Sequence, residues 1–239
     1  LKMSKYLIFG ATGSIGTKLA EELYKSNKEI HLIGRDKDQL EILSSKVNCD
    51  YTVLDVLNEN ISEFVKDEFK DIEVSGIAYC VGSIDLKPLK ISKKDDFQKC
   101  LDLNFFPVIE IIKSLQENLK KNNGSIVLFS TVAVRKGFTN HAIISSTKGA
   151  IEGLTVSLAA EFAPNIRVNC IAPTLTNSKM SQNILKSKIM AESIAKSHPM
   201  KRIGKPEDVA SMAKFLLTSE SSFITGQIIS VDGGKSSLS

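Results

Sequence analysis

The chain has no tryptophan, and aromatic residues make up only 6% of its 239 residues. This scarcity argues against a nucleic-acid surface that stacks bases on aromatic side chains. The net charge is +4, but no block of like charges is long enough to form a basic or acidic arm. No apolar run approaches the roughly 18 residues of a membrane-spanning helix. We therefore expect neither a nucleic acid nor a membrane as a partner.

The four cysteines, Cys49, Cys80, Cys100 and Cys170, form no Cys-x-x-Cys pair. This spacing weakens zinc-binding and thioredoxin-like interpretations, so no metal site is predicted. Cys80 and Cys170 lie in apolar runs typical of buried strands, where a reduced cysteine behaves as a small hydrophobic residue. The first predicted strand follows no cationic and apolar leader. A cytoplasmic location is the resulting expectation.

Short apolar runs alternate with helical patterns along the whole chain. Strands are predicted at 6–9, 30–33, 51–54, 76–81, 124–130, 166–171 and 227–231. Helices are predicted at 15–25, 38–46, 61–69, 95–119 with a bend at Pro107, around Lys148 to about 162, and at 206–217. Nearly all-apolar strands in such alternation indicate a parallel sheet with helices on both faces. Since no linker or repeat interrupts the pattern, we predict a single α/β domain over residues 1–239, a Rossmann-type doubly wound parallel seven-stranded sheet.

The segment Gly10-Ala11-Thr12-Gly13-Ser14-Ile15-Gly16 follows the first strand and opens the first helix. Glycines let the backbone approach a pyrophosphate, and the helix N-terminus offers free amides and a positive dipole. In this position the segment predicts a dinucleotide site.

The end of the second predicted strand reads Gly34-Arg35-Asp36. Gly34 stands where an acidic residue would hold the ribose hydroxyls of NAD, whereas the Arg35 guanidinium can bind a 2′-phosphate. This favours NADP(H) over NAD(H). Two alternatives stay open, namely that Arg35 is an ordinary solvated charge and that Asp36 is recruited for the ribose.

The segment Ile144-Ser145-Ser146-Thr147-Lys148, with the small apolar helix after it, resembles the active-site helix of the short-chain dehydrogenase/reductase family. The family pattern is Tyr-x-x-x-Lys, and Ile144 replaces the tyrosine. Residues 199–208 and 224–234 closely match the family's C-terminal signatures and resemble 3-oxoacyl-(acyl-carrier-protein) reductases and related sugar or alcohol dehydrogenases. The resemblance covers essentially the whole chain.

The resemblance implies roles for individual residues. Asn104 would position a water for proton relay, and Lys148 would hold the nicotinamide ribose. Thr131, thirteen residues before Ile144, would replace the serine that binds the substrate carbonyl. The implied cofactor contacts are Gly10, Thr12, Gly13, Ser14, Ile15, Gly16, Arg35, Asp55, Val56, Gly82, Lys148, Pro173 and Ser178. Ser14 and Thr174 stand where the family commonly has glycine, and of its Asn-Asn-Ala-Gly only Gly82 is retained.

Isoleucine has no proton to donate, and a positioned general acid contributes roughly 10²–10⁴-fold to a rate. Candidate replacements for the missing proton donor are Thr131, Ser145, a water held by Lys148 and Asn104, and His141. His141 is a candidate because an unperturbed imidazole titrates at about pH 6.5. An exposed loop histidine is the alternative interpretation of His141.

Two functions stay open. The first is an NADP-dependent carbonyl reductase or alcohol dehydrogenase that transfers a hydride between nicotinamide and a small carbonyl or alcohol substrate. The second is a catalytically silent dinucleotide-binding homologue with a regulatory or scaffolding role. By analogy with relatives, the helices at 95–119 and around Lys148 would form a homotetramer, or else a dimer. The loop 178–198 would form a substrate lid, or a helix packed on the core.

Overall fold

The structure is a computed structural model that describes residues 4–58 and 60–238. Seven strands form one parallel sheet in the order β3-β2-β1-β4-β5-β6-β7. They are β1 (Lys5–Phe9), β2 (Ile30–Gly34), β3 (Asp50–Val53), β4 (Val74–Tyr79), β5 (Ser125–Phe129), β6 (Arg167–Pro173) and β7 (Ile228–Val231). The strand order reverses direction between β1 and β4, which is the topological switch point where open α/β sheets bind ligands. The predicted fold class is confirmed.

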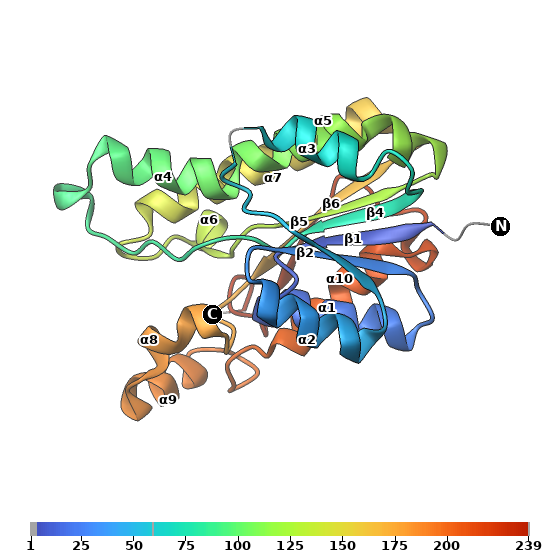
Figure 1. Cartoon of the computed structure of the whole chain (residues 1–239). Helices are drawn as coiled ribbons and strands as arrows, with labels where there is room; N and C mark the ends of the chain where they lie inside the picture. The colour runs from blue at the N-terminus through green and yellow to red at the C-terminus, as the bar shows by residue number, and fades with distance from the viewer. Residues whose placement is uncertain (1–3, 59, 239) are drawn as a thin grey trace.

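Helices cover both faces of the sheet, as Figure 1 shows. One layer contains α1 (Ser14–Lys25), α2 (Lys37–Val47) and α10 (Pro206–Leu217), and the other contains α3 (Ile61–Glu68), α4 (Lys94–Asn104), α5 (Phe106–Lys121) and α7 (Ala142–Phe162). The short helix α6 (Ala133–Lys136) follows β5. Each layer has its own hydrophobic core, because the apolar strands place side chains on both faces of the sheet.

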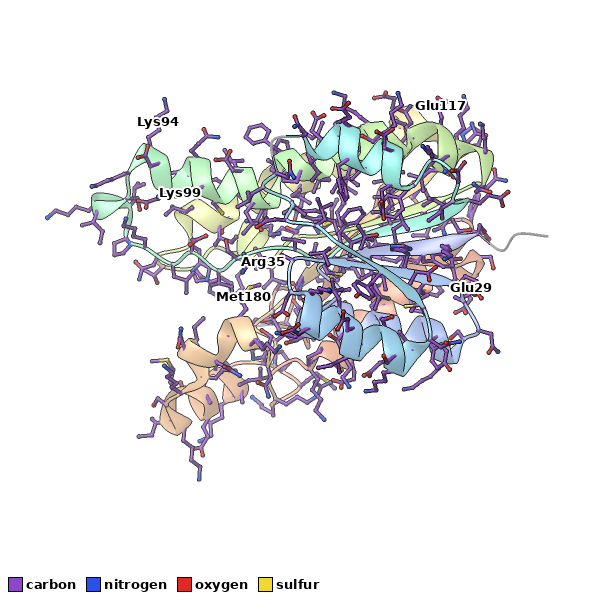
Figure 2. The ribbon with its side chains drawn as sticks, viewed as in Figure 1. Glu29, Arg35, Lys94, Lys99, Glu117 and Met180 are labelled. Atoms are coloured by element: carbon purple, nitrogen blue, oxygen red, sulfur yellow. The ribbon has the colours of Figure 1, made fainter. Side chains whose placement is uncertain are left out.

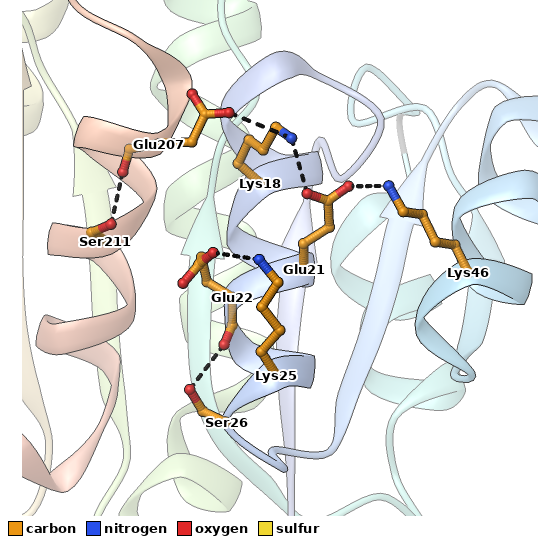
Figure 3. Close-up of polar contacts among 8 residues, drawn as sticks. All are labelled: Lys18, Glu21, Glu22, Lys25, Ser26, Lys46, Glu207 and Ser211. Atoms are coloured by element: carbon orange, nitrogen blue, oxygen red, sulfur yellow. Dashed lines mark hydrogen bonds and ion pairs between the residues drawn. The ribbon is translucent and has the colours of Figure 1, made fainter.

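Ion pairs hold α1, the helix that opens at the glycine-rich turn, to its two neighbours (Figure 3). Glu21 accepts from Lys18 at 3.0 Å and from Lys46 of α2 at 2.5 Å. Lys18 also lies 3.4 Å from Glu207 of α10. Glu21 is buried and is the most shielded member of this network. Its pair with Lys46 joins α1 to α2, and the pair of Lys18 with Glu207 joins α1 to α10.

The predicted bend of a single helix at Pro107 is wrong. The helix ends at Asn104, and a new helix starts at Phe106, with Phe105 at φ −121° and ψ −58° between them. Pro107 lies in the first turn of α5, where a missing N–H costs no hydrogen bond. The proline therefore starts a helix, and Asn104 becomes the last residue of α4.

Two further expectations need adjustment. β4 ends at Tyr79, so Cys80 lies just beyond the strand and is half-buried, whereas Cys170 is fully buried in β6. All four cysteines are free thiols. The segment expected as a loop, 178–198, is instead largely helical, with the 3₁₀ turn η2 (Lys179–Ser181), α8 (Gln182–Leu185) and α9 (Lys188–Lys196).

The helices α8 and α9 stand out from the body of the molecule and bury no residue fully (Figure 1). We call η2, α8 and α9 the lid segment. Ile189 is 82% exposed, which argues against close packing of α9 on the core. Across the described parts of the chain, none of the helices has both the length and the apolar content that crossing a bilayer requires.

Candidate active site

A cleft of about 490 Å³ lies at the carboxyl ends of β1, β4, β5 and β6, next to the switch point. The lid segment covers it with Met180, Ile184 and Ile194. Nine of the residues predicted for the site line this cleft: Gly13, Ser14, Ile15, Gly82, Thr131, Ile144, Lys148, Pro173 and Ser178.

The glycine-rich turn has the backbone geometry that a phosphate needs. Gly10 has φ +75°, and a Cβ on it would lie 2.9 Å from the backbone nitrogen of Val81. A Cβ on Gly16 would lie 2.4 Å from the carbonyl oxygen of Gly10. Gly13 is the N-cap of α1 and has no side chain that could accept a hydrogen bond from the first amides of the helix. These amides stay available to a ligand where Gly13, Ser14 and Ile15 line the cleft. The turn therefore fits a dinucleotide pyrophosphate.

Asn104 and Lys148 converge on Gly82. Asn104 is fully buried, and its Nδ2 donates to the Cys100 carbonyl at 2.9 Å. Its Oδ1 is buried without a hydrogen-bond partner in the described structure. A Cβ on Gly82 would lie 2.9 Å from that oxygen and 3.5 Å from Lys148 Nζ. Only glycine leaves this space open, and the space offers one acceptor and one donor to a small polar ligand atom.

The Lys148 ammonium is buried at the floor of the cleft. It forms no ion pair with a carboxylate among residues 4–58 and 60–238. Burial lowers the pKa of Lys148 to about 8, and the thiols of Cys170, Cys100 and Cys80 oppose that shift weakly. At this pKa the side chain can both give and take a proton near neutral pH.

Ile144 lies one helical turn before Lys148 and is 5% exposed. It packs against Cys100 and Ile143 and presents only carbon atoms to the cleft. Ser145 Oγ donates to the Ala133 carbonyl at 3.1 Å, so its proton is already used in the fold. Ser145 is therefore a poor replacement for a phenol at position 144.

Two other candidate donors, Thr131 and His141, do line the cleft. Thr131 Oγ1 accepts from the Ala133 amide at 3.3 Å, which leaves its own proton free for a ligand. His141 Nδ1 lies 2.7 Å from the Thr139 carbonyl, which can only accept, so Nδ1 carries a proton. Nε2 of His141 can then donate only when the ring is charged.

Several predicted cofactor residues lie outside the lining of the cleft. Arg35 and Asp55 are exposed, and Asp55 accepts from the Leu57 amide at 3.0 Å. Val56 is buried in the core, and Thr12 is half-buried behind the glycine-rich turn. Asp36 caps α2 by accepting from the Gln39 amide at 3.1 Å.

Some contacts at the site were not predicted from the sequence. Ser130 Oγ donates to Glu152 at 2.7 Å, which anchors the end of β5 to α7. His198 is buried and joins the lid segment to Thr174, with Nε2 2.9 Å from the threonine hydroxyl. His198 Nδ1 lies 2.7 Å from the Ile194 carbonyl, which can only accept, so Nδ1 donates. The threonine at the family's glycine position was the one sequence signal for this contact.

The fold and the cleft define a protein that binds a nicotinamide dinucleotide at the switch point of a doubly wound sheet. Residues 10–236 match the family described as enoyl-(acyl carrier protein) reductase. A tropinone reductase homologue of Arabidopsis thaliana is 32% identical over 241 residues, which cover 95% of this chain and 90% of the relative. The 3-oxoacyl-(acyl-carrier-protein) reductase FabG of Rickettsia bellii is 31% identical over 234 residues, or 95% of each chain.

Solved structures agree with this assignment. A short-chain type dehydrogenase/reductase from Mycobacterium ulcerans matches with a TM-score of 0.90 at 27% identity and covers 99% of this chain and 91% of its own. ElxO with NADP bound matches with a TM-score of 0.89 at 29% identity and covers 98% of both chains. The chain belongs to the short-chain dehydrogenase/reductase family of NAD(P)-dependent oxidoreductases, which transfer a hydride between nicotinamide and a small-molecule substrate.

Proposed function

We propose that the whole chain, residues 1–239, is one NADP(H)-dependent carbonyl reductase or alcohol dehydrogenase domain that moves its proton without a phenol. The supporting observation is the shared space at Gly82, where the unpartnered Asn104 oxygen and the Lys148 ammonium face each other. A water there would accept from Lys148 and donate to Asn104 or to a substrate oxygen.

When bound, the nicotinamide supplies or accepts the hydride. In the reductive direction, the Thr131 hydroxyl donates a hydrogen bond to the substrate oxygen and orients the carbonyl. The alkoxide takes its proton from the water, and the Lys148 ammonium replaces the proton that the water loses. A lysine with a pKa of about 8 can then recover its proton from solvent at neutral pH. Ile144 supplies an apolar wall beside the reacting carbon and takes no part in proton transfer.

The preference for NADP(H) over NAD(H) is also a proposal. Arg35 is exposed at the end of β2 and forms no ion pair in the described part of the chain. Gly34 places no carboxylate there that would repel a 2′-phosphate, and Asp36 is occupied as the cap of α2. ElxO, a structural relative, was solved with NADP bound. By family analogy we propose a homotetramer with α4, α5 and α7 in its interfaces, and a dimer as the alternative.

The decisive test measures NADPH oxidation with a panel of ketones, sugars and acyl thioesters for the parent, Ile144→Tyr and Ile144→Phe. We expect measurable turnover by the parent that Lys148→Met and Asn104→Leu abolish. The phenol of Ile144→Tyr should raise the rate by roughly 10²–10⁴-fold, because Lys148 on the same helix face lowers the pKa of a phenol there. Ile144→Phe adds a ring without a proton and should give no such gain.

The missing phenol itself favours the second candidate, a silent dinucleotide-binding homologue. That function is supported if the parent binds NADPH without turnover and Ile144→Tyr gains activity on a substrate that the parent ignores. A parent that turns over but loses activity in His141→Ala would instead assign the proton donor to the imidazolium.

A further inference from the structure

Lys179 connects the lid segment to the N-terminal ends of α1 and α2. Its backbone N–H donates to Ser14 Oγ at 3.2 Å, and its ammonium donates to Gln39 Oε1 at 2.8 Å. Ser14 opens α1 at the glycine-rich turn, and Gln39 lies in the first turn of α2. One lid residue therefore contacts both elements that border the phosphates and the ribose of a dinucleotide.

The charge of Lys179 is not neutralised where it lies. No carboxylate pairs with its ammonium in residues 4–58 and 60–238, and its acceptor is a neutral amide. The nearby Asp36 carboxylate is already shared with the side chain of Gln39, at 2.6 Å. A phosphate oxyanion is a stronger acceptor for an ammonium than an amide oxygen is.

Arg35 adds a second cation to this edge. It precedes α2 directly, and Figure 2 shows Arg35 and Met180, the neighbour of Lys179, at the same end of the sheet. The contacts of Lys179 with Ser14 and Gln39 confirm that the lid segment reaches this edge. Cations from the turn between β2 and α2 and from the lid segment thus border the place where the cofactor's phosphates would lie.

We propose that Lys179 binds a phosphate of the dinucleotide from the lid segment. The inference rests on the proposed function only in requiring a dinucleotide in the cleft. The ligand chemistry is a phosphate oxyanion, which either the pyrophosphate or the 2′-phosphate of NADP can supply. The two sources differ in one respect, since only NADP carries the 2′-phosphate.

The test is calorimetric titration of NADP⁺ and NAD⁺ into the parent, Lys179→Gln and the control Lys186→Gln. Lys179→Gln removes the charge but keeps the backbone N–H that binds Ser14. Lys186 lies between α8 and α9 of the lid segment, is exposed and lines no part of the cleft. We expect Lys179→Gln to weaken dinucleotide binding roughly 10-fold, the usual worth of one charge-assisted hydrogen bond, and Lys186→Gln to leave it unchanged.

The pattern of the loss identifies the phosphate. A loss confined to NADP⁺ assigns the 2′-phosphate, and an equal loss for NADP⁺ and NAD⁺ assigns the pyrophosphate. Unchanged affinities in Lys179→Gln, or the same loss in Lys186→Gln, would overturn the inference while leaving the proposed function intact. A parent that binds neither dinucleotide would overturn both. Circular dichroism melts of both variants check that exposed substitutions leave the fold intact.

Discussion

Replacing Lys148 by methionine should stabilise the folded chain, although it removes the proposed proton source. Burial lowers the pKa of Lys148 from 10.5 to about 8, so the unfolded chain holds this proton more tightly than the folded chain does. At about 1.4 kcal/mol for each pH unit, the charged side chain costs the fold roughly 3 kcal/mol below pH 8. The cost disappears as the pH rises from 8 to 10.5, where the amine is neutral in both states.

Urea denaturation at a series of pH values from 7 to 10.5, without added cofactor, measures this difference. Lys148→Met should be about 3 kcal/mol more stable than the parent at pH 7, and the gap should close toward pH 10.5. Cysteines and tyrosines titrate in the parent and in Lys148→Met alike, so the difference in unfolding free energy between the two proteins reports on Lys148. Lys186→Met, at an exposed site, should show no pH-dependent gap. A constant gap for Lys148→Met would refute the reasoning, because it would mean that solvent in the cleft hydrates the ammonium fully.

Two further predictions concern the turn and the core. Gly16→Ala should abolish dinucleotide binding in titrations and destabilise the fold by about 1–3 kcal/mol, because its Cβ would lie 2.4 Å from the Gly10 carbonyl. The control Gly153→Ala lies in open space on α7 and should be neutral or stabilising; equal losses of stability in the two variants would contradict this prediction. Burial lowers the pKa of His31 to about 4, so parent stability should fall by up to about 3 kcal/mol between pH 6.5 and 4, whereas urea melts of His31→Leu should lack that component.

The periodicity of the sequence was sufficient to predict the sheet and most helices. The helix predicted at 206–217 has the same bounds in the structure, because a proline begins it and an amphipathic pattern runs to its end. The break at Phe105 was missed because the apolar period continues across it from α4 into α5. A proline in such a pattern is equally compatible with a bend and with a new first turn.

The sequence predicts residues of the cleft where the residue type and its position relative to a predicted strand or helix are both distinctive. Three residues of the glycine-rich turn line the cleft, as do Thr131, Ile144 and Lys148. The contacts of Lys179 were beyond sequence reasoning, because they join it to Ser14 and to Gln39, 165 and 140 residues away. The contact of His198 with Thr174 also could not be predicted, because it depends on the path of the chain through the lid segment.

With isoleucine at position 144, the space beside Gly82 still lies between Asn104 and Lys148. Within the described residues, the buried Asn104 oxygen has no hydrogen-bond partner, and burial of the Lys148 ammonium lowers its pKa, so both groups cost the fold. Both groups border the same space beside Gly82, so a single polar ligand atom there would form hydrogen bonds with both. Ligand binding at this space should therefore be favourable whether or not position 144 carries a phenol. In the proposed mechanism Ile144 takes no part in proton transfer, so Ile144→Tyr tests what an added phenol contributes, whereas Lys148→Met tests the proposed proton source itself.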